Sequence, residues 1–159
     1  MTTTEQKIKY MFSYSFPIGT LYIAEADGAV TDIGYRAVAG AVEKETPLIK
    51  QAAEMLREYF HSGRKSFEGL PIRPEGTEFQ KKAWAALLTI PYGETRSYKE
   101  QAETLGNAKA CRAVGAANGK NPISIVIPCH RVIGADKSLT GYGGGMDAKK
   151  ALLELESRA

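Results

Sequence analysis

The sequence predicts an α+β protein, in which a small N-terminal α/β domain (antiparallel sheet plus helix) precedes a mostly helical C-terminal domain. Three observations carry this prediction. An Asp-Gly pair at 27–28 separates two apolar runs, which is a hairpin signal, and apolar residues recur with a helical period across 47–61. The C-terminal half holds short helical segments with capping residues before them and glycines after them. A chain of 159 residues suffices for one ordinary domain or two small ones.

Strands and one helix are expected in the N-terminal part. The segments 9–16, 20–26 and 29–35 are typical of strands. The helix expected at 47–61 stops before Gly63. Its apolar face consists of Leu48, Ala52, Met55, Leu56, Tyr59 and Phe60. His61 ends this helix, where a favourable contact with the helix dipole explains it better than metal binding does.

A proline-rich, irregular stretch at 70–76 is typical of a linker. We therefore expect an N-terminal α+β structural domain with its linker at 1–75 and a C-terminal domain at 76–159. The first part has nine Lys and Arg against ten Asp and Glu, and the second has twelve against eight. The basic excess favours an anionic partner for the C-terminal domain, although a few surplus lysines often serve only solubility.

Three helices are expected next. Thr77 caps one that runs to about Ile90, with an apolar face of Phe79, Ala83, Trp84, Leu87 and Leu88, and Trp84 is interpreted as a core residue. Ser97 and Glu100 form a capping box for a second helix, which stops at Gly106. Asn107 is expected to cap the third, which carries Cys111, Arg112, Ala113, Gly115 and Ala116.

Two short helices around a glycine-containing turn indicate a helix-turn-helix, although helical hairpins are also common in proteins that never touch DNA. Five Lys and Arg stand against two Glu between residues 96 and 121. The small residues of the second helix would let its backbone approach a partner closely, and Arg112 lies in the middle of that face. The pattern is therefore compatible with DNA binding.

The segment 125–132 reads Ile-Val-Ile-Pro-Cys-His-Arg-Val. Its apolar start is typical of a buried extended strand, and Pro128 makes a stiff corner at its end. Cys129, a strong nucleophile, and His130, a common general base, follow that corner. This arrangement suggests a thiol that is presented for reaction. A core cysteine beside a surface histidine is about equally compatible with these residues alone.

The end of the chain offers a loop and a helix. Residues 139–145 are glycine-dense around Tyr142, which suits either close wrapping around something flat or simple flexibility. Asp147 opens a helix whose buried face is expected to contain Ala148, Ala151, Leu152 and Leu155. Glu156 lies beside that face, where an ordinary helix would have a solvated charge.

The sequence also indicates where in the cell the protein is expected. No apolar run approaches a membrane span and no signal-peptide pattern is present, so we expect a cytoplasmic protein without a membrane partner. Two cysteines, Cys111 and Cys129, do not make a disulfide framework and are expected to be thiols.

The segment from Phe79 to Glu156 closely resembles the O6-alkylguanine-DNA alkyltransferases, also called methylated-DNA–protein-cysteine methyltransferases. The resemblance rests on the order and spacing of short motifs. They are Ile-Pro-Tyr-Gly-Glu-Thr at 90–95, Ser-Tyr at 97–98, Arg-Ala-Val-Gly at 112–115, Asn-Pro at 121–122, Pro-Cys-His-Arg-Val at 128–132 and Tyr-Gly-Gly-Gly at 142–145. The N-terminal half matches only in size and general character.

The resemblance implies a monomeric suicide repair protein that acts on double-stranded DNA. It transfers the alkyl group of O6-alkylguanine, and also of O4-alkylthymine, to Cys129 in a single turnover, without a cofactor or metal. His130 would activate Cys129 through a water, with Glu156 holding His130 and Asn121 bracing the turn. Tyr98 would help rotate the nucleotide and protonate the departing guanine, and Arg112 would enter the stack where the flipped base was. Val132, Tyr142, Gly143 and Gly144 would line the guanine pocket, and Ala113, Gly115 and Ala116 would lie against DNA.

Two positions depart from the family pattern. Gly143 stands where the family often has serine, so one hydroxyl contact to O6 is missing and backbone donors are expected instead. Cys111 occupies a position that usually holds a small residue, and we interpret it as a helix residue rather than a second acceptor. The zinc site that some relatives carry in the N-terminal domain is not expected, because that domain has a single histidine, His61, and no cysteine.

Other classes compete with this interpretation. A cysteine hydrolase would also use a Cys-His pair, but normally from separated segments, and it would leave the helix-turn-helix idle. A transcription regulator explains the helices and the charge but not the Cys-His corner. Alkyltransferase-like proteins bind damaged bases without repairing them and lack the cysteine, which Cys129 argues against.

Overall fold

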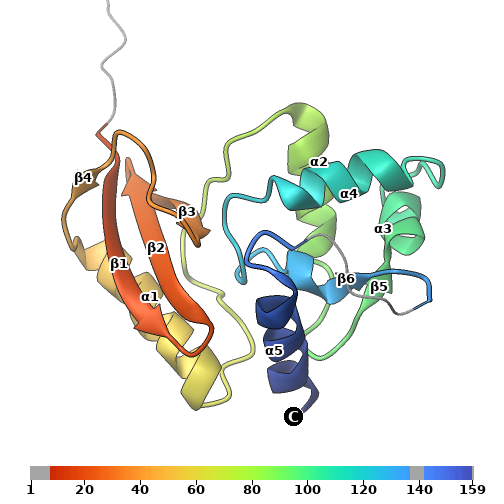
Figure 1. Cartoon of the computed structure of the whole chain (residues 1–159). Helices are drawn as coiled ribbons and strands as arrows, with labels where there is room; N and C mark the ends of the chain where they lie inside the picture. The colour runs from red at the N-terminus through yellow and green to blue at the C-terminus, as the bar shows by residue number, and fades with distance from the viewer. Residues whose placement is uncertain (1–7, 137–141, 159) are drawn as a thin grey trace, which may run out of the picture. The chain divides into compact units, whose positions relative to one another are not determined.

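The structure is a computed structural model that describes residues 8–136 and 142–158, and the chain divides into two compact units, Met1–Arg73 and Pro74–Ala159. The first unit contains a four-stranded sheet with the strand order β3-β2-β1-β4 (Figure 1). The second unit is mostly helical. The predicted fold class is confirmed.

The sheet grows from two tight hairpins. β1 (Tyr10–Phe16) pairs antiparallel with β2 (Gly19–Ala26), and β2 pairs antiparallel with β3 (Ala29–Gly34). Asp27 and Gly28 form the second turn with φ of 52° and 80°, and two positive values are what a type I′ hairpin requires. The expected hairpin at 27–28 is confirmed. The short β4 (Val42–Glu43) pairs parallel to β1.

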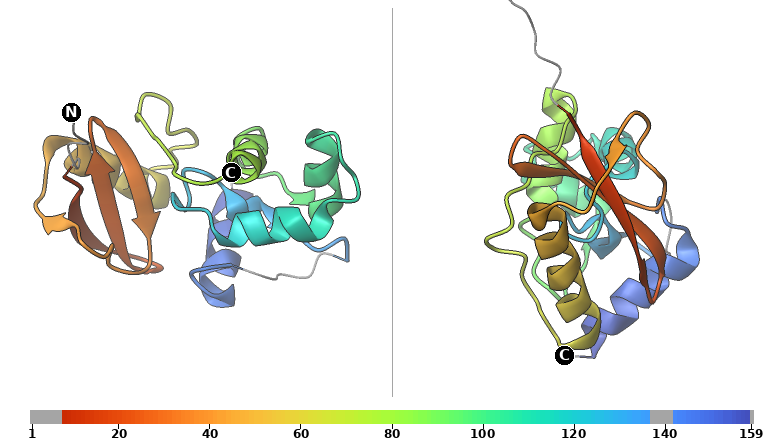
Figure 2. Two further views of the ribbon diagram at one scale, coloured as in Figure 1. Left: turned by 90° about the horizontal axis from the view of Figure 1, so that it is seen from above. Right: turned by 90° about the vertical axis from the view of Figure 1, so that its left-hand side faces the viewer.

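Helix α1 (Pro47–His61) covers one face of the sheet, as two of the views show (Figure 2). Thr46 caps it by accepting a hydrogen bond from the Ile49 backbone. The bounds expected for this helix are confirmed, but its buried face is shifted. Leu48 and Phe60 are only half-buried, whereas the fully or nearly fully buried residues are Ile49, Ala52, Ala53, Met55, Leu56 and Tyr59.

The proline-rich stretch is not wholly irregular. Val30 donates its backbone N–H to the carbonyl of Pro71 and accepts one from Arg73, so Ile72 lies beside Val30 of β3 as a one-residue strand extension. Part of the expected linker therefore belongs to the sheet of the first unit.

In the second unit, α2 (Glu78–Leu87), α3 (Tyr98–Thr104) and α4 (Cys111–Gly119) pack against one another. A buried polar network joins them. Trp84, 1% exposed, donates its indole N–H to the carbonyl of Ala117 over 2.8 Å. Gln101 and Asn118 exchange two amide hydrogen bonds, and Gln101 also donates to the carbonyl of Ala83. The cap expected at Thr77 and the capping box expected at Ser97 are both present, and Thr77 forms a capping box as well, with Gln80.

Three expectations for these helices are wrong. α2 ends at Leu87 rather than Ile90, and Phe79 and Leu88 are 38% and 50% exposed, since the buried residues of the helix all lie between Ala83 and Leu87. Asn107 does not cap α4. Its side chain instead accepts from the backbone of Lys109 in a local turn, and α4 begins four residues after Asn107.

The rest of the second unit forms the frame of the site. β5 (Arg96–Ser97) pairs parallel with β6 (Val132–Ile133), and the short 3₁₀ turn η1 (Cys129–Arg131) leads directly into β6. Helix α5 (Met146–Ser157) packs on η1. Of the expected apolar face of α5, Ala148 and Leu152 are buried, but Ala151 is exposed and Leu155 is half-buried. Two charged residues, Lys149 and Glu156, are buried in their place.

Candidate active site

The apolar run before the cysteine is a tight turn and not the expected extended strand. Ile125 has φ of 72°, and the Val126 backbone donates to the carbonyl of Ser124 over 2.8 Å, which defines a γ-turn centred on Ile125. A β-branched residue at positive φ is an outlier, and Ile125 is only 1% exposed. Burial of the isoleucine side chain therefore overrides the local backbone preference.

A second turn follows at once. Pro128, with φ −83° and ψ 65°, is the centre of an inverse γ-turn in which the Cys129 backbone donates to the carbonyl of Ile127 over 2.8 Å. Cys129 thus begins η1 directly after a rigid corner. Cys129 is only 8% exposed, so its thiol is largely buried.

Asn121 ties the two turns together. Its amide donates to the carbonyl of Ile127 over 2.7 Å, and its oxygen accepts from the backbone of Ile123 over 3.0 Å. Both ends of the segment around Ile125 are therefore held by one side chain. The Asn121 side chain also hydrogen-bonds to Cys129 in a way that favours the thiolate.

The two residues after Cys129 belong to a buried cluster of ionisable side chains, which consists of His130, Arg131 and Glu156. Nε2 of His130 lies 2.7 Å from Oε2 of Glu156, which α5 supplies. Arg131 donates from Nε to Oε1 and from Nη2 to Oε2 of the same carboxylate, over 2.8 and 3.0 Å. The backbone N–H of Gly93 approaches Oε1 at 3.4 Å. The side chains of His130, Arg131 and Glu156 are 0%, 8% and 1% exposed, so this cluster is shielded from water.

These contacts fix the state of His130. An ionised Glu156 only accepts, so Nε2 carries the ring proton and the lone pair lies on Nδ1. Nδ1 is buried and has no hydrogen-bond partner among the described residues. Burial lowers the pKa of His130 below its ordinary value, Glu156 opposes this, and the positive charges of Arg131 and Lys149 add to the lowering. The buried surroundings therefore favour a neutral imidazole with its lone pair on the buried Nδ1.

Lys149 is a site residue that sequence reasoning missed. It is 1% exposed, and its ammonium donates to the carbonyl of Val132 over 2.7 Å. Burial raises the pKa of the Cys129 thiol, whereas the Asn121 hydrogen bond and the charge of Lys149 lower it. Burial also lowers the pKa of Lys149, and Cys129 opposes that shift. The sequence spacing could have indicated that Lys149 is buried. It lies three residues before Leu152 and seven before Glu156, so all three share one face of the helix.

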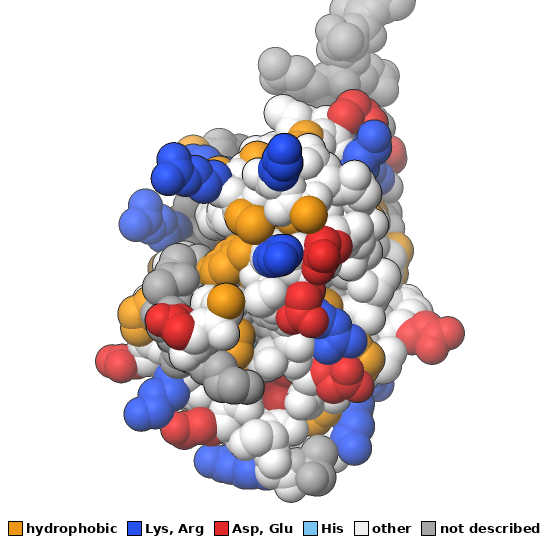
Figure 3. Space-filling model, turned by 90° about the vertical axis from the view of Figure 1, so that its right-hand side faces the viewer, with side chains coloured by type: hydrophobic (Ala, Val, Ile, Leu, Met, Phe, Trp, Pro, Cys, Tyr) orange, Lys and Arg blue, Asp and Glu red, His pale blue; other side chains and the backbone are white. Residues whose placement is uncertain are grey.

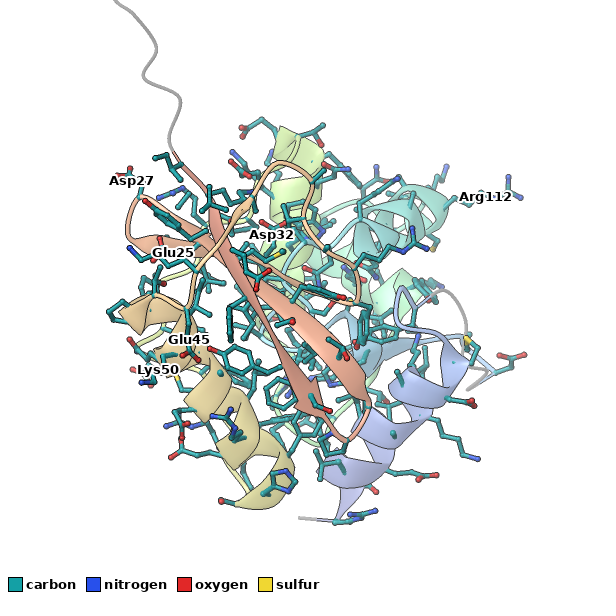
Figure 4. The ribbon with its side chains drawn as sticks, turned by 60° about the vertical axis from the view of Figure 1, so that its left-hand side comes forward. Glu25, Asp27, Asp32, Glu45, Lys50 and Arg112 are labelled. Carbon is teal, nitrogen blue, oxygen red and sulfur yellow. The ribbon has the colours of Figure 1, made fainter. Side chains whose placement is uncertain are left out.

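The residues expected to meet DNA form a separate group on α3 and α4. Arg112, Ala113 and Ala116 are exposed, and Gly115 is half-buried. Arg112 extends outward from α4 (Figure 4). A Cβ placed on Gly115 of α4 would come within 3.8 Å of the ring of Tyr98, the first residue of α3, so the two helices lie close together at this point. In the view of Figure 3, Lys and Arg side chains lie around a hydrophobic patch in the upper part, and acidic side chains lie mostly below it.

The remaining expected residues are placed as follows. Val132 is fully buried in β6, and Tyr142 is 8% exposed. Gly143 and Gly144 lie in a turn that closes with a hydrogen bond from Gly145 to Tyr142. The part of the glycine-rich loop at 139–141 lies outside the described residues. Cys111 is a half-buried free thiol at the start of α4.

Within the described ranges, His, Cys, Asp and Glu side chains form no group of three that could hold a metal ion. Within the same ranges, no helix is both long and apolar enough to cross a membrane.

The chain is similar to proteins of one kind along almost its whole length. Residues 9–74 match the family model of the 6-O-methylguanine DNA methyltransferase ribonuclease-like domain, and residues 78–158 match the model of the DNA binding domain. It is 44% identical over 155 residues to the methylated-DNA–protein-cysteine methyltransferase of Methanosarcina acetivorans, covering 92% of this chain and 97% of that protein. The protein of the same name from Haemophilus influenzae is 42% identical over 153 residues, covering 92% and 86%.

A solved structure shows the same likeness in three dimensions. The crystal structure of Mycobacterium tuberculosis OGT in complex with DNA has a TM-score of 0.87 and 44% identity, covering 94% of this chain and 93% of that chain. Family models, relatives and structure therefore agree, and the chain belongs to the 6-O-methylguanine DNA methyltransferase family.

Proposed function

We propose that this protein repairs DNA by transferring the alkyl group of O6-alkylguanine to its own Cys129. The observation that carries the proposal is the buried His130, which follows Cys129 in the chain and is held by Glu156 over 2.7 Å. An ordinary thiol has a pKa of about 8.5 and is mostly protonated at neutral pH. A buried base that takes the thiol proton removes this limitation.

The reaction is a single nucleophilic displacement, in which sulfur replaces the guanine oxygen on the alkyl carbon. A water accepts the proton of the Cys129 thiol and gives one of its own to Nδ1 of His130, and the sulfur attacks the alkyl carbon. The carbon–oxygen bond breaks, its electron pair leaves with guanine, and the Tyr98 hydroxyl supplies a proton to the departing base. The product is a thioether, which nothing in the proposed site can cleave, so each molecule reacts once. O4-alkylthymine, which offers a similar alkyl–oxygen bond, is a second substrate.

The family relation supports the DNA partner, since a relative of this fold has been solved with DNA bound. We assign the helix-turn-helix to α3 and α4, with Arg112, Ala113, Gly115 and Ala116 against the duplex. Val132, Tyr142, Gly143 and Gly144 line the guanine pocket. We further assign the protein to the cytoplasm as a monomer, where a reducing environment keeps the two thiols free.

Mass spectrometry tests the activity directly. The protein is mixed with a duplex oligonucleotide that contains O6-methylguanine, and its peptides are then weighed. We expect one added methyl group on the Cys129 peptide and no turnover beyond one equivalent. A protein whose mass is unchanged, or one that consumes many equivalents, would contradict the proposal.

Arg112 is expected to serve the duplex rather than the chemistry. Unstacking a base step costs a few kcal/mol, which an inserted side chain offsets. Arg112→Ala should therefore slow repair of duplex DNA on the order of tenfold to a hundredfold. Reaction with free O6-benzylguanine should stay nearly unchanged. Lys120→Ala removes the same charge from the exposed end of α4 and is the matched control, with a small effect on both substrates. Equal slowing of both reactions in Arg112→Ala would rule out the wedge role.

The rate of alkyl transfer should depend little on pH around neutrality. The pKa of His130 is lowered and that of Cys129 is raised, so neutral imidazole and protonated thiol coexist between them. A reaction from this pair is flat over about pH 6.5–8.5 and falls in acid as His130 becomes protonated. Single-turnover rates with O6-benzylguanine measure this profile. A tenfold rise per pH unit would instead indicate a free thiolate that reacts without the base.

A further inference from the structure

Arg131 makes more contacts with the site than a simple salt bridge requires. Besides its two bonds to Glu156, it donates from Nη1 to the carbonyl of Ile90 over 2.7 Å. Its guanidinium lies over the ring of Tyr92, 5.7 Å from the centroid. The planar fork is thus fixed on three sides, and it meets both carboxylate oxygens in the bidentate geometry that arginine favours.

Glu156 is shared between two partners that can both be cationic. With Arg131 charged and His130 neutral, the buried cluster has no net charge. Protonation of His130 would give the same cluster a net positive charge in a site shielded from water, which is costly. Without Arg131, the balance reverses, because a buried carboxylate would then draw a proton onto the only cationic partner left to it.

We propose that Arg131 is a positioning residue that keeps His130 neutral by taking up the charge of Glu156, so that Nδ1 is available as a base. The proposal rests on the proposed function for the role of that base, but not for its charge state. Other groups act on the same ring. Lys149 from α5 disfavours the imidazolium, Cys129 is the proton donor, and Tyr92 lies beside Arg131 and Glu156.

Histidine NMR reads this charge state without any activity measurement. The chain has two histidines, so selectively labelled protein gives two ring spin systems, and His61→Gln identifies the signals of His130. We expect wild-type His130 to remain the neutral Nε2–H tautomer at pH 6. In Arg131→Gln, which keeps an amide donor for Ile90 and Glu156 but has no charge, His130 should become protonated within the neutral range. Arg131→Lys restores the charge and should return His130 to the neutral form.

Two controls separate this effect from general damage. Arg57→Gln removes an arginine from an exposed pair with Glu54 on α1 and should leave the His130 titration unchanged. Tryptophan fluorescence verifies that the second unit of each variant is folded, and circular dichroism does so for the whole chain. If no folded Arg131→Gln protein is obtained, the wild-type titration decides, since the proposal requires His130 to remain neutral at pH 6.

Each outcome has a defined meaning. A wild-type His130 that is already an imidazolium at pH 6 overturns the proposal, and so does an Arg131→Gln variant whose His130 stays neutral. The rate profile then tests the function separately. If His130 becomes protonated in Arg131→Gln, the acid fall in the alkyl-transfer rate should move up into the neutral range, by about tenfold in rate per pH unit below the new pKa. A protonated His130 with an unchanged rate profile would keep the inference and reject His130 as the base.

Discussion

Replacing Cys129 with serine should abolish alkyl transfer while leaving DNA binding intact. A serine hydroxyl is a far weaker nucleophile than a thiol at neutral pH, and removal of a nucleophile commonly costs several orders of magnitude in rate. We expect a loss of more than about a thousandfold, measured as methyl incorporation from a duplex that contains O6-methylguanine. The serine is nearly isosteric, so the buried corner after Pro128 should keep its conformation.

Cys111→Ser is the matched control for this experiment. Cys111 is the other free thiol, and its sulfur lies 3.5 Å from the carbonyl of Ala108 on a half-buried helix start. That variant should react at nearly the wild-type rate. Methyl transfer by Cys129→Ser near the wild-type rate, or its loss in Cys111→Ser, would move the acceptor assignment away from Cys129.

Replacing Glu156 with glutamine should strongly destabilise the second unit. Its carboxylate neutralises the buried Arg131, and removing one partner of a buried ion pair typically costs about 3–5 kcal/mol in the free energy of unfolding. Trp84 is the only tryptophan and is buried in the second unit, so its fluorescence in a urea titration follows that unit alone. The single-turnover rate of the folded fraction should fall as well, because the bond that orients His130 loses its charge.

Glu94→Gln makes the same substitution in an exposed pair. Glu94 and Arg96 lie 3.1 Å apart with 53% and 35% of their side chains exposed, and such pairs contribute about 0.2–1 kcal/mol. Both variants lose one carboxylate charge, so a difference between their free energies of unfolding reports the effect of burial. A loss in Glu156→Gln as small as that in Glu94→Gln would mean that the buried cluster contributes little to stability.

Local patterns predicted much of this fold because their causes are local. The Asp27-Gly28 turn needs two positive φ values, and the capping boxes at Thr77 and Ser97 satisfy backbone donors within the same four residues. Each of these features is determined by neighbouring residues. The bounds of α1 follow in the same way from its cap and its period.

Features that depend on distant partners could not be predicted from pattern alone. Burial of Lys149 makes sense only once the carbonyl of Val132 and the thiol lie beside it. Arg131 binds Glu156, which lies 25 residues further along the chain. In the sequence, Arg131 stands out only as part of the Pro-Cys-His-Arg-Val motif. Gln101 and Asn118 likewise resemble surface polar residues until their mutual pairing is seen. The roles given to the site residues by the resemblance stay predictions, which the variants above test.

Ile125 meets two requirements that oppose each other. Its positive φ favours glycine, at a cost of about 1–3 kcal/mol for any other residue, while its buried side chain is worth about as much or more in packing. Glycine would relieve the backbone and open a cavity, and a larger or polar residue would satisfy neither requirement. Isoleucine at this position is therefore a compromise between backbone strain and packing. A single substitution that improves one of the two is expected to worsen the other, in the segment that leads to Cys129.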